Sequence, residues 1–335
     1  MRTWSRRDVL KSGLLAAGAA MIPDQAFALL PTSGEVDGPR IAELAPLSAA
    51  THIRDRLLLD FDWRFHLGHA ADPAQDFGFG RGNDGAFAKT GYFFAPARPD
   101  FDASHWAAVD LPHDWAVALP FVNDPALTSH GFKPVGRAYP ATSIGWYRKT
   151  FAIPAADAGR RLSLEFDGVY RNCIVTLNDV YLTTALSGYA PFRVDVTDVA
   201  QYGGDNVLVV RVDATENEGW FYEGAGIYRH VWLVKTAPMH VPQWGAVVTS
   251  EVRGTAAHLH LQTTVVNDGD TDADCRVVSR VVDAAGATQA SAVAGGVRVP
   301  AWGQATVDQT ATIAHPERWS VDAPHLYRLV TTIET

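Results

Sequence analysis

Apolar and polar residues alternate with the two-residue period of a β-strand at 146–151 and 162–166, and other short apolar runs lie within residues 57–237. Turn pairs such as Asp167-Gly168 and Asn178-Asp179 separate several of these runs, and we find no ten-residue amphipathic helix between them. The predicted strands are 57–61, 63–65, 146–151, 162–166, 174–177, 192–196, 207–212 and 228–234. This spacing predicts an all-β domain, a jelly-roll β-sandwich, over residues 55–237.

A second group of predicted strands follows Pro238 and Pro242, which we take as the domain boundary. These strands are 246–252, 258–267, 275–283, 293–299, 305–313 and 327–333. Six or so strands within about one hundred residues is the size of an immunoglobulin-like β-sandwich, which we predict for residues 238–335.

The first 28 residues carry the features of an export signal. Ser5-Arg6-Arg7-Asp8-Val9-Leu10-Lys11 matches the twin-arginine pattern, residues 14–22 are mildly apolar, and Ala26-Phe27-Ala28 fits a cleavage site. An ordinary amphipathic helix is the alternative. We expect a twin-arginine signal peptide at 1–28, a linker or disordered arm at 29–54, and a periplasmic or secreted protein.

Composition narrows the range of partners. With 28 Lys and Arg against 37 Asp and Glu, the formal net charge is −9, which argues against nucleic acid because phosphate neutralisation needs a basic face. The apolar run at 14–22 is far shorter than the roughly twenty residues that span a bilayer. We therefore expect no nucleic-acid and no membrane partner, whereas a neutral ligand such as a sugar is compatible with this charge.

An aromatic turn at 216–226 carries the clearest functional signal. Trp220, Phe221 and Tyr222 stand together on a polar segment that runs through Gly224-Ala225-Gly226 into a predicted strand. Exposed flat rings at a strand end suit a sugar-binding surface, because they can stack on the C–H faces of a pyranose ring.

Several blocks in order, across residues 57–333, resemble glycoside hydrolase family 2. They are Leu111-Pro112-His113-Asp114-Trp115, Gly145-Trp146-Tyr147-Arg148-Lys149-Thr150-Phe151, Phe166-Asp167-Gly168-Val169-Tyr170-Arg171-Asn172, Gly188-Tyr189-Ala190-Pro191-Phe192, the aromatic turn with Gly226-Ile227-Tyr228-Arg229, and Trp319-Ser320-Val321-Asp322-Ala323-Pro324-His325-Leu326-Tyr327. Members of that family are β-glycosidases, notably β-galactosidases, β-mannosidases and β-glucuronidases.

The resemblance implies a galactose-binding-like jelly roll, then an immunoglobulin-like sandwich, then a catalytic (β/α)₈ barrel with two glutamates. No part of residues 1–335 resembles the barrel. We therefore expect a non-catalytic N-terminal portion of an exported, β-galactosidase-like enzyme, inactive alone. A stand-alone carbohydrate-binding protein and a structural or interaction module are the alternatives. Expected partners are a weakly bound carbohydrate and either a second copy of the chain or a separately encoded catalytic barrel.

The candidate site residues follow from the same motifs. Those expected to contact a sugar are Trp220, Tyr222, Glu223 and Arg229. Those expected to hold the structure are His113, Asp114, Trp115, Trp146, Tyr147 and Arg148. No catalytic residue is expected, and Asn217-Glu218 is interpreted as a solvated loop.

No metal or cofactor is expected. His258 and His260 share one strand face but lack a third ligand, and the acidic run 268–272 lacks the distal glutamate of a calcium loop. Cys173 and Cys275 lie in different predicted domains. Two buried free thiols and an inter-domain disulfide are both compatible with an exported protein.

Overall fold

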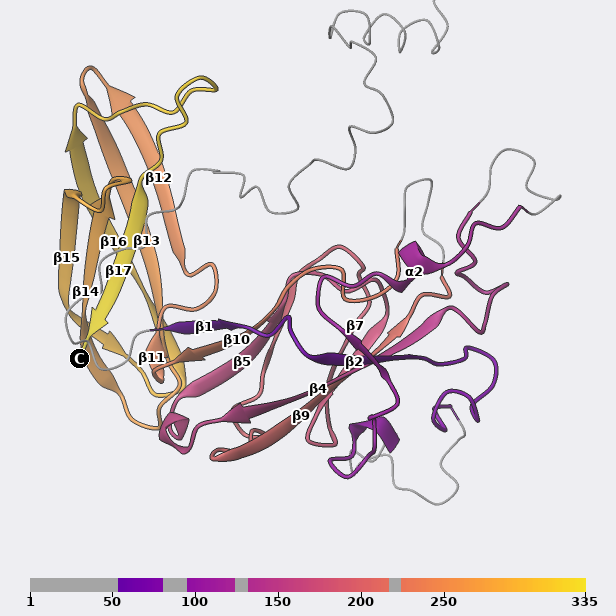
Figure 1. Ribbon diagram of the computed structural model, residues 1–335. Helices are drawn as coiled ribbons and strands as arrows, with labels where there is room; N and C mark the ends of the chain where they lie inside the picture. Colours follow the sequence, from indigo (N-terminus) through magenta and orange to yellow (C-terminus); the bar gives the residue numbers. More distant parts are fainter. Residues whose placement is uncertain (1–53, 81–94, 124–131, 217–223) are drawn as a thin grey trace, which may run out of the picture. The chain divides into compact units, whose positions relative to one another are not determined.

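A computed structural model describes residues 54–80, 95–123, 132–216 and 224–335. These residues form β-sandwiches with one short α-helix, α2 (Trp115–Ala118), and two 3₁₀ turns, η2 (Ala95–Ala97) and η3 (Ala155–Asp157) (Figure 1). The predicted all-β fold, a jelly roll followed by an immunoglobulin-like sandwich, is confirmed. The predicted signal peptide and linker lie outside the described residues, except for Arg54.

Two antiparallel sheets build the first sandwich. The four-stranded sheet has the order β1 (Asp55–Leu58), β10 (Val231–Thr236), β5 (Arg161–Phe166), β8 (Phe192–Asp195). The six-stranded sheet has the order β3 (Ala107–Val109), β2 (Trp63–Leu67), β4 (Ile144–Ile153), β9 (Gly204–Asp213), β6 (Cys173–Leu177), β7 (Val180–Ala185). Neighbours such as β1 and β10 are far apart in sequence, so long-range pairing closes the domain.

The six-stranded sheet is buried on both faces at β4. Tyr147 points into the main core with Trp63, whereas Trp146 points the other way into a second cluster with Trp106 and Phe77. Successive side chains of a strand face opposite sides, so two adjacent large aromatic residues require two apolar layers. The segments before β3 supply that second layer.

A buried ion pair fixes one of these covering segments. The Asp76 carboxylate lies 2.7 Å from the Arg211 guanidinium on β9, and its other oxygen accepts a hydrogen bond of 2.6 Å from Trp146 Nε1. Arg211 also lies over the ring of Phe79, 3.7 Å from its centroid. Removing one member of such a buried pair typically costs about 3–5 kcal/mol, because the other charge is left uncompensated.

The second sandwich also has two antiparallel sheets. In one, β13 (Ala256–Asn267) lies between β16 (Gly303–Ala314) and the two strands β11 (Met239–His240) and β12 (Ala246–Arg253). The other has the order β15 (Thr288–Val299), β14 (Ala273–Val282), β17 (Arg328–Glu334). Side chains of β13 alternate between buried and exposed, as the two-residue period predicts.

Some element predictions were incomplete. The strand predicted at 228–234 is observed as Val231–Thr236, and the segment before it contains Gly226, whose φ of 127° is not that of an extended strand. The sequence pattern did not predict β3, β7 and β11. In β7 no side chain is fully buried, so an apolar face does not stand out in the sequence.

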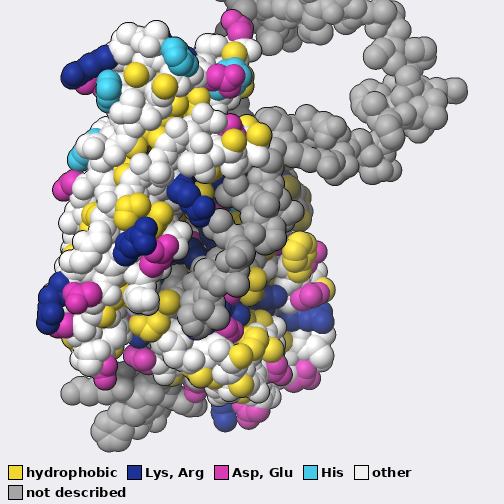
Figure 2. Space-filling view, turned by 90° about the vertical axis from the view of Figure 1, so that its left-hand side faces the viewer, with side chains coloured by type: hydrophobic (Ala, Val, Ile, Leu, Met, Phe, Trp, Pro, Cys, Tyr) yellow, Lys and Arg dark blue, Asp and Glu magenta, His cyan; other side chains and the backbone are white. Residues whose placement is uncertain are grey.

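Both cysteines are free thiols and buried. Cys173 belongs to the core of the first sandwich and Cys275 to a core cluster of the second, so the structure favours free thiols over an inter-domain disulfide. No helix in the described part of the chain is long and apolar enough to span a membrane. Acidic and basic side chains are interspersed over the face shown in Figure 2.

Candidate functional site

The aromatic turn divides into a described and an undescribed part. Trp220, Tyr222 and Glu223 lie outside the described residues, as does the pair Asn217-Glu218. The chain is described again from Gly224, through the end of the turn at Gly226, to β10. These residues show how the end of the turn is attached to the sandwich, and they include the fourth predicted sugar contact, the exposed Arg229.

The Pro-His-Asp-Trp block holds the chain directly after the turn. Asp114 caps α2 by accepting a hydrogen bond from the Ala116 N–H at 2.9 Å, and the same carboxylate oxygen accepts the Ala225 N–H at 2.9 Å. The backbone N–H groups of Trp115 and His113 donate to the carbonyls of Ala225 and Ile227. One side chain and two backbone groups therefore fasten residues 225–227 to a segment more than one hundred positions earlier.

His113 and Tyr147 form a second attachment below this segment. His113 Nδ1 lies 2.8 Å from the Tyr147 hydroxyl, which also donates to the His113 carbonyl at 3.2 Å. Burial raises the pKa of Tyr147 well above its ordinary value and lowers the pKa of His113, against the opposing effect of Asp114 on the histidine. Both side chains are therefore held in their neutral forms, which suits a structural pair.

The other motif residues make contacts within the fold. Trp115 Nε1 donates to the Thr142 carbonyl at 2.8 Å, and Trp146 reaches Asp76 as described above. The Arg148 guanidinium donates to the carbonyls of Pro96, Arg98 and Pro99. All six residues predicted to hold the structure thus contact the core or its covering segments.

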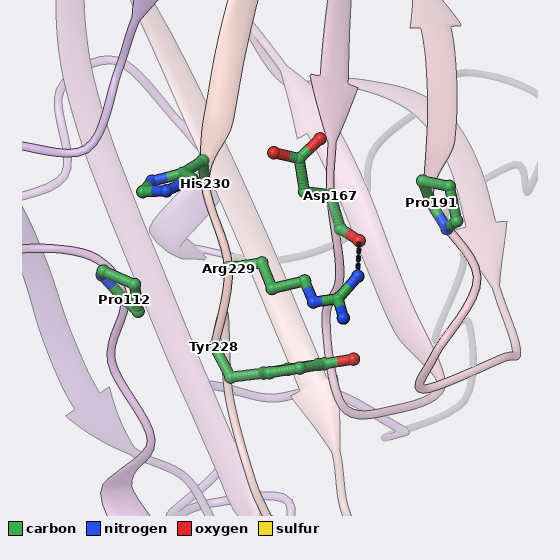
Figure 3. A pocket seen from close by; sticks show the side chains of 6 residues that line it. All are labelled: Pro112, Asp167, Pro191, Tyr228, Arg229 and His230. Atoms are coloured by element: carbon green, nitrogen blue, oxygen red, sulfur yellow. Dashed lines mark hydrogen bonds between the residues drawn. The ribbon is translucent and has the colours of Figure 1, made fainter. Parts of the chain in front are cut away.

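A hollow of about 400 Å³ opens beside residues 228–230. Its lining residues are Pro112, Asp167, Pro191, Tyr228, Arg229 and His230 (Figure 3). Arg229 extends across the hollow towards the Asp167 carbonyl, with the Tyr228 ring beneath it, while Pro191 lies on one side and Pro112 and His230 on the other. Of these six, sequence reasoning selected only Arg229 as a site residue.

The sequence analysis placed the start of β10 too early, and so it did not select Tyr228 and His230 as site residues. We assigned Tyr228 and His230 to a regular strand, but that strand begins only at Val231, and the residues before it follow Gly226 with its positive φ. Gly226, three positions before the polar pair Arg229-His230, could have indicated that the regular strand starts later.

The structure gives no candidate metal centre among the described residues. His260 Nε2 lies 3.1 Å from Asp308, and His258 lies beside Thr312. Asp268 contacts Arg161, and Asp272 contacts Arg298. These acidic groups are engaged by basic side chains.

Two models of known protein domains together match residues 124–335. A family model described as "Glycosyl hydrolase 2 galactose-binding domain-like" matches residues 124–247, and one described as "Glycosyl hydrolases family 2" matches residues 240–335. The chain belongs to glycoside hydrolase family 2. The predicted family is therefore confirmed, and the two models meet near the predicted domain boundary.

Two curated members of family 2 illustrate the similarity. A protein named β-galactosidase BoGH2A, from Bacteroides ovatus, is 39% identical over 284 residues, which are 84% of this chain and 30% of the relative. A β-glucuronidase from Formosa agariphila is 25% identical over 257 residues, covering 70% of this chain and 26% of that protein. This chain thus spans less than a third of either relative.

Solved structures of family 2 proteins also resemble this chain. The crystal structure of a glycosyl hydrolase family 2 member from Bacteroides cellulosilyticus aligns with a TM-score of 0.68 at 29% identity, covering 84% of this chain and 34% of that one. A β-glucuronidase of the family aligns with a TM-score of 0.67 at 21% identity, which supports the fold alone.

Proposed function

We propose that this chain is the non-catalytic, two-sandwich portion of an exported, β-galactosidase-like glycosidase of family 2. The observation that carries this proposal is the 39% identity to a β-galactosidase through 84% of the chain. The enzyme as a whole would hydrolyse O-glycosidic bonds of β-galactosides. The sandwiches would present the aromatic turn at a fixed position, since residues 225–227 are fastened to the Pro-His-Asp-Trp block.

We expect no turnover from these residues by themselves. Retaining hydrolysis of a glycoside needs two carboxyl groups about 5–5.5 Å apart, one as nucleophile and one as acid and base. The described hollow has one carboxyl group, that of Asp167. This group already accepts a hydrogen bond of 2.9 Å from Trp232 Nε1 and lies 3.7 Å from Arg56, contacts that stabilise the fold.

The test measures hydrolysis of aryl β-galactoside, β-mannoside, β-glucoside and β-glucuronide substrates by the purified chain of 335 residues. We expect no release above buffer, and restored β-galactosidase activity if a separately encoded family 2 barrel is supplied. Release that follows the protein through purification and disappears in Glu218→Gln would contradict the proposal. Light scattering on the same sample measures whether the chain forms a homo-oligomer instead.

A stand-alone carbohydrate-binding protein is the second candidate. The hollow at residues 228–230 favours it, because its side chains are already positioned by internal contacts. The two functions differ in affinity. A fragment that offers part of a sugar subsite, with Trp220, Tyr222, Glu223 and Arg229, would bind monosaccharides with Kd of about 1 mM or weaker, whereas a dedicated module would reach about 1 μM. Calorimetry with glycans separates these ranges.

Export by the twin-arginine route is part of the proposal. It rests on Arg6-Arg7 and the Ala26-Phe27-Ala28 cleavage pattern. Replacing both arginines by lysine should leave the precursor in the cytoplasm, with a mass that includes residues 1–28. Continued export of this double variant to the periplasm or medium would refute the assignment.

A further inference from the structure

Three consecutive residues at the hollow are each held by a different part of the chain. The Tyr228 hydroxyl donates to the Gly188 carbonyl at 2.8 Å. Arg229 donates to the Asp167 carbonyl at 3.4 Å, and His230 Nδ1 lies 2.5 Å from the Asp60 carboxylate. Arg229 and His230 are nevertheless exposed, so these contacts fix side chains that contribute little to the core.

The Asp60 carboxylate orients the His230 imidazole. Asp60 is only 2% exposed, and its other carboxylate oxygen accepts the Val231 N–H at 3.0 Å. Because Asp60 engages Nδ1, Nε2 is the ring nitrogen that can meet a ligand. The His230 side chain is 49% exposed, which leaves this nitrogen accessible.

Gly168 makes room for the other two side chains. A Cβ atom at this position would stand 2.9 Å from both Arg229 Cδ and the Tyr228 hydroxyl. The Arg229 guanidinium lies 5.5 Å from the centroid of the Tyr228 ring, with the ring beneath it in Figure 3. The 3.4 Å contact to Asp167 uses one corner of the guanidinium, and an arginine carries five N–H donors.

The charges around the hollow favour a neutral ligand rich in hydroxyl groups. The lining holds one acid, Asp167, and one base, Arg229, which meets the Asp167 backbone carbonyl, and His230 Nε2 adds a hydrogen-bond acceptor. A carboxylate ligand would meet the Asp167 charge, which costs affinity. The apolar surfaces of Pro112 and Pro191 can contact C–H groups, and the volume of about 400 Å³ falls within the range of small-molecule sites, about 300–1,000 Å³.

We propose that this hollow binds one neutral hexopyranose unit. His230 Nε2 and the Arg229 N–H groups meet ring hydroxyls, and the two prolines and Tyr228 border the C–H surface of the sugar. The proposal uses only described residues, and of the four sugar contacts predicted from the sequence it includes Arg229. The inference rests on the proposed carbohydrate role of the chain and adds a location and a ligand class to it.

The experiment is calorimetric titration of the full chain with methyl β-galactoside, methyl β-glucoside and glucuronate. We expect millimolar binding of a neutral glycoside, at least tenfold weaker binding of glucuronate, and at least tenfold loss of affinity in Arg229→Ala and in His230→Ala. Arg253→Ala and His325→Ala are matched controls on the second sandwich. The His325 side chain is 48% exposed, close to that of His230, and these variants should bind normally.

A second measurement does not depend on how the variants fold. In wild-type protein the imidazole C–H resonances of His230, assigned by their loss in His230→Ala, should shift on addition of the glycoside. If His230→Ala binds normally while Trp220→Ala does not, the hollow is not the site and the proposed function stands. If wild type binds none of the three sugars, or the His230 resonances do not move, the inference is wrong. Turnover by the chain would contradict the proposed function without bearing on this site.

Discussion

The carboxylate of Asp114 accepts a hydrogen bond of 2.9 Å from the backbone N–H of Ala225, although 111 positions separate the two residues. The same oxygen caps helix α2 through the Ala116 N–H. The Asp114 side chain thus caps the start of α2 and also holds the chain where it leaves the aromatic turn.

Replacing Asp114 by alanine should destabilise the first sandwich by about 1.5–5 kcal/mol. The loss of the helix cap accounts for about 0.5–2 kcal/mol and the unsatisfied Ala225 N–H for a further 1–3 kcal/mol. Chemical denaturation followed by tryptophan fluorescence measures it. The control is Asp205→Ala, which removes an exposed carboxylate and should change stability by no more than about 0.5 kcal/mol. Equal effects of the two substitutions would contradict the role of Asp114.

Gly226→Ala should destabilise the protein by about 3 kcal/mol or more. Gly226 has a φ of 127°, and a Cβ there would stand 2.3 Å from the Tyr147 hydroxyl and 2.5 Å from the His113 carbonyl oxygen. Backbone strain and overpacking therefore add. Gly295→Ala is the matched control, because nothing lies within 4 Å of its added Cβ. We expect Gly295→Ala to leave the midpoint of thermal unfolding unchanged or slightly higher, and a similar fall in both variants would count against this account.

Stability should fall as the pH drops below about 6.5, in part because of His113. Burial lowers the pKa of His113 below its ordinary value of 6.5. The folded state then binds a proton less readily than the unfolded state. The contribution of His113 to stability is fully present above its pKa in the unfolded chain and is lost as the pH falls through its pKa in the folded protein.

The free energy of unfolding of wild type and His113→Asn, measured between pH 7.5 and 5, tests this expectation. The variant should show a shallower slope in this window. Burial also lowers the pKa of His240, so part of the pH dependence should remain in His113→Asn. Replacing His240 by asparagine should remove a further part of this slope. A slope that is identical in wild type and His113→Asn would show that His113 does not titrate in this way.

Both cysteines should be unreactive in the native protein and reactive after unfolding. Burial raises the pKa of Cys173 to about 12 and also raises the pKa of Cys275, so neither thiol forms thiolate near neutral pH. A thiol reagent such as Ellman's should detect no thiol in the folded chain and two after denaturation without reductant. Detection of none after denaturation would indicate the disulfide that the sequence left open.

Local patterns in the sequence were sufficient for the fold class and most strands. Short apolar runs between turn residues predicted β4, β9 and β13; β13 alternates between buried and exposed positions, whereas β4 and β9 are buried on both faces. The motif blocks were sufficient for the family, because their order along the chain is specific. Strands with few buried side chains, such as β7, left no such trace.

Only the tertiary structure decided which distant residues meet. Nothing in the sequence near Asp60 marks His230 as its partner, and nothing near Asp114 marks Ala225, because these contacts depend on strand pairing across more than one hundred residues. The side chains of Tyr228 and Arg229 likewise take their positions only because Gly168, on another loop, has no Cβ there. The sequence alone determined the family and the β architecture, since both follow from local residue patterns. The site geometry required the folded chain, since it arises from contacts between separate segments.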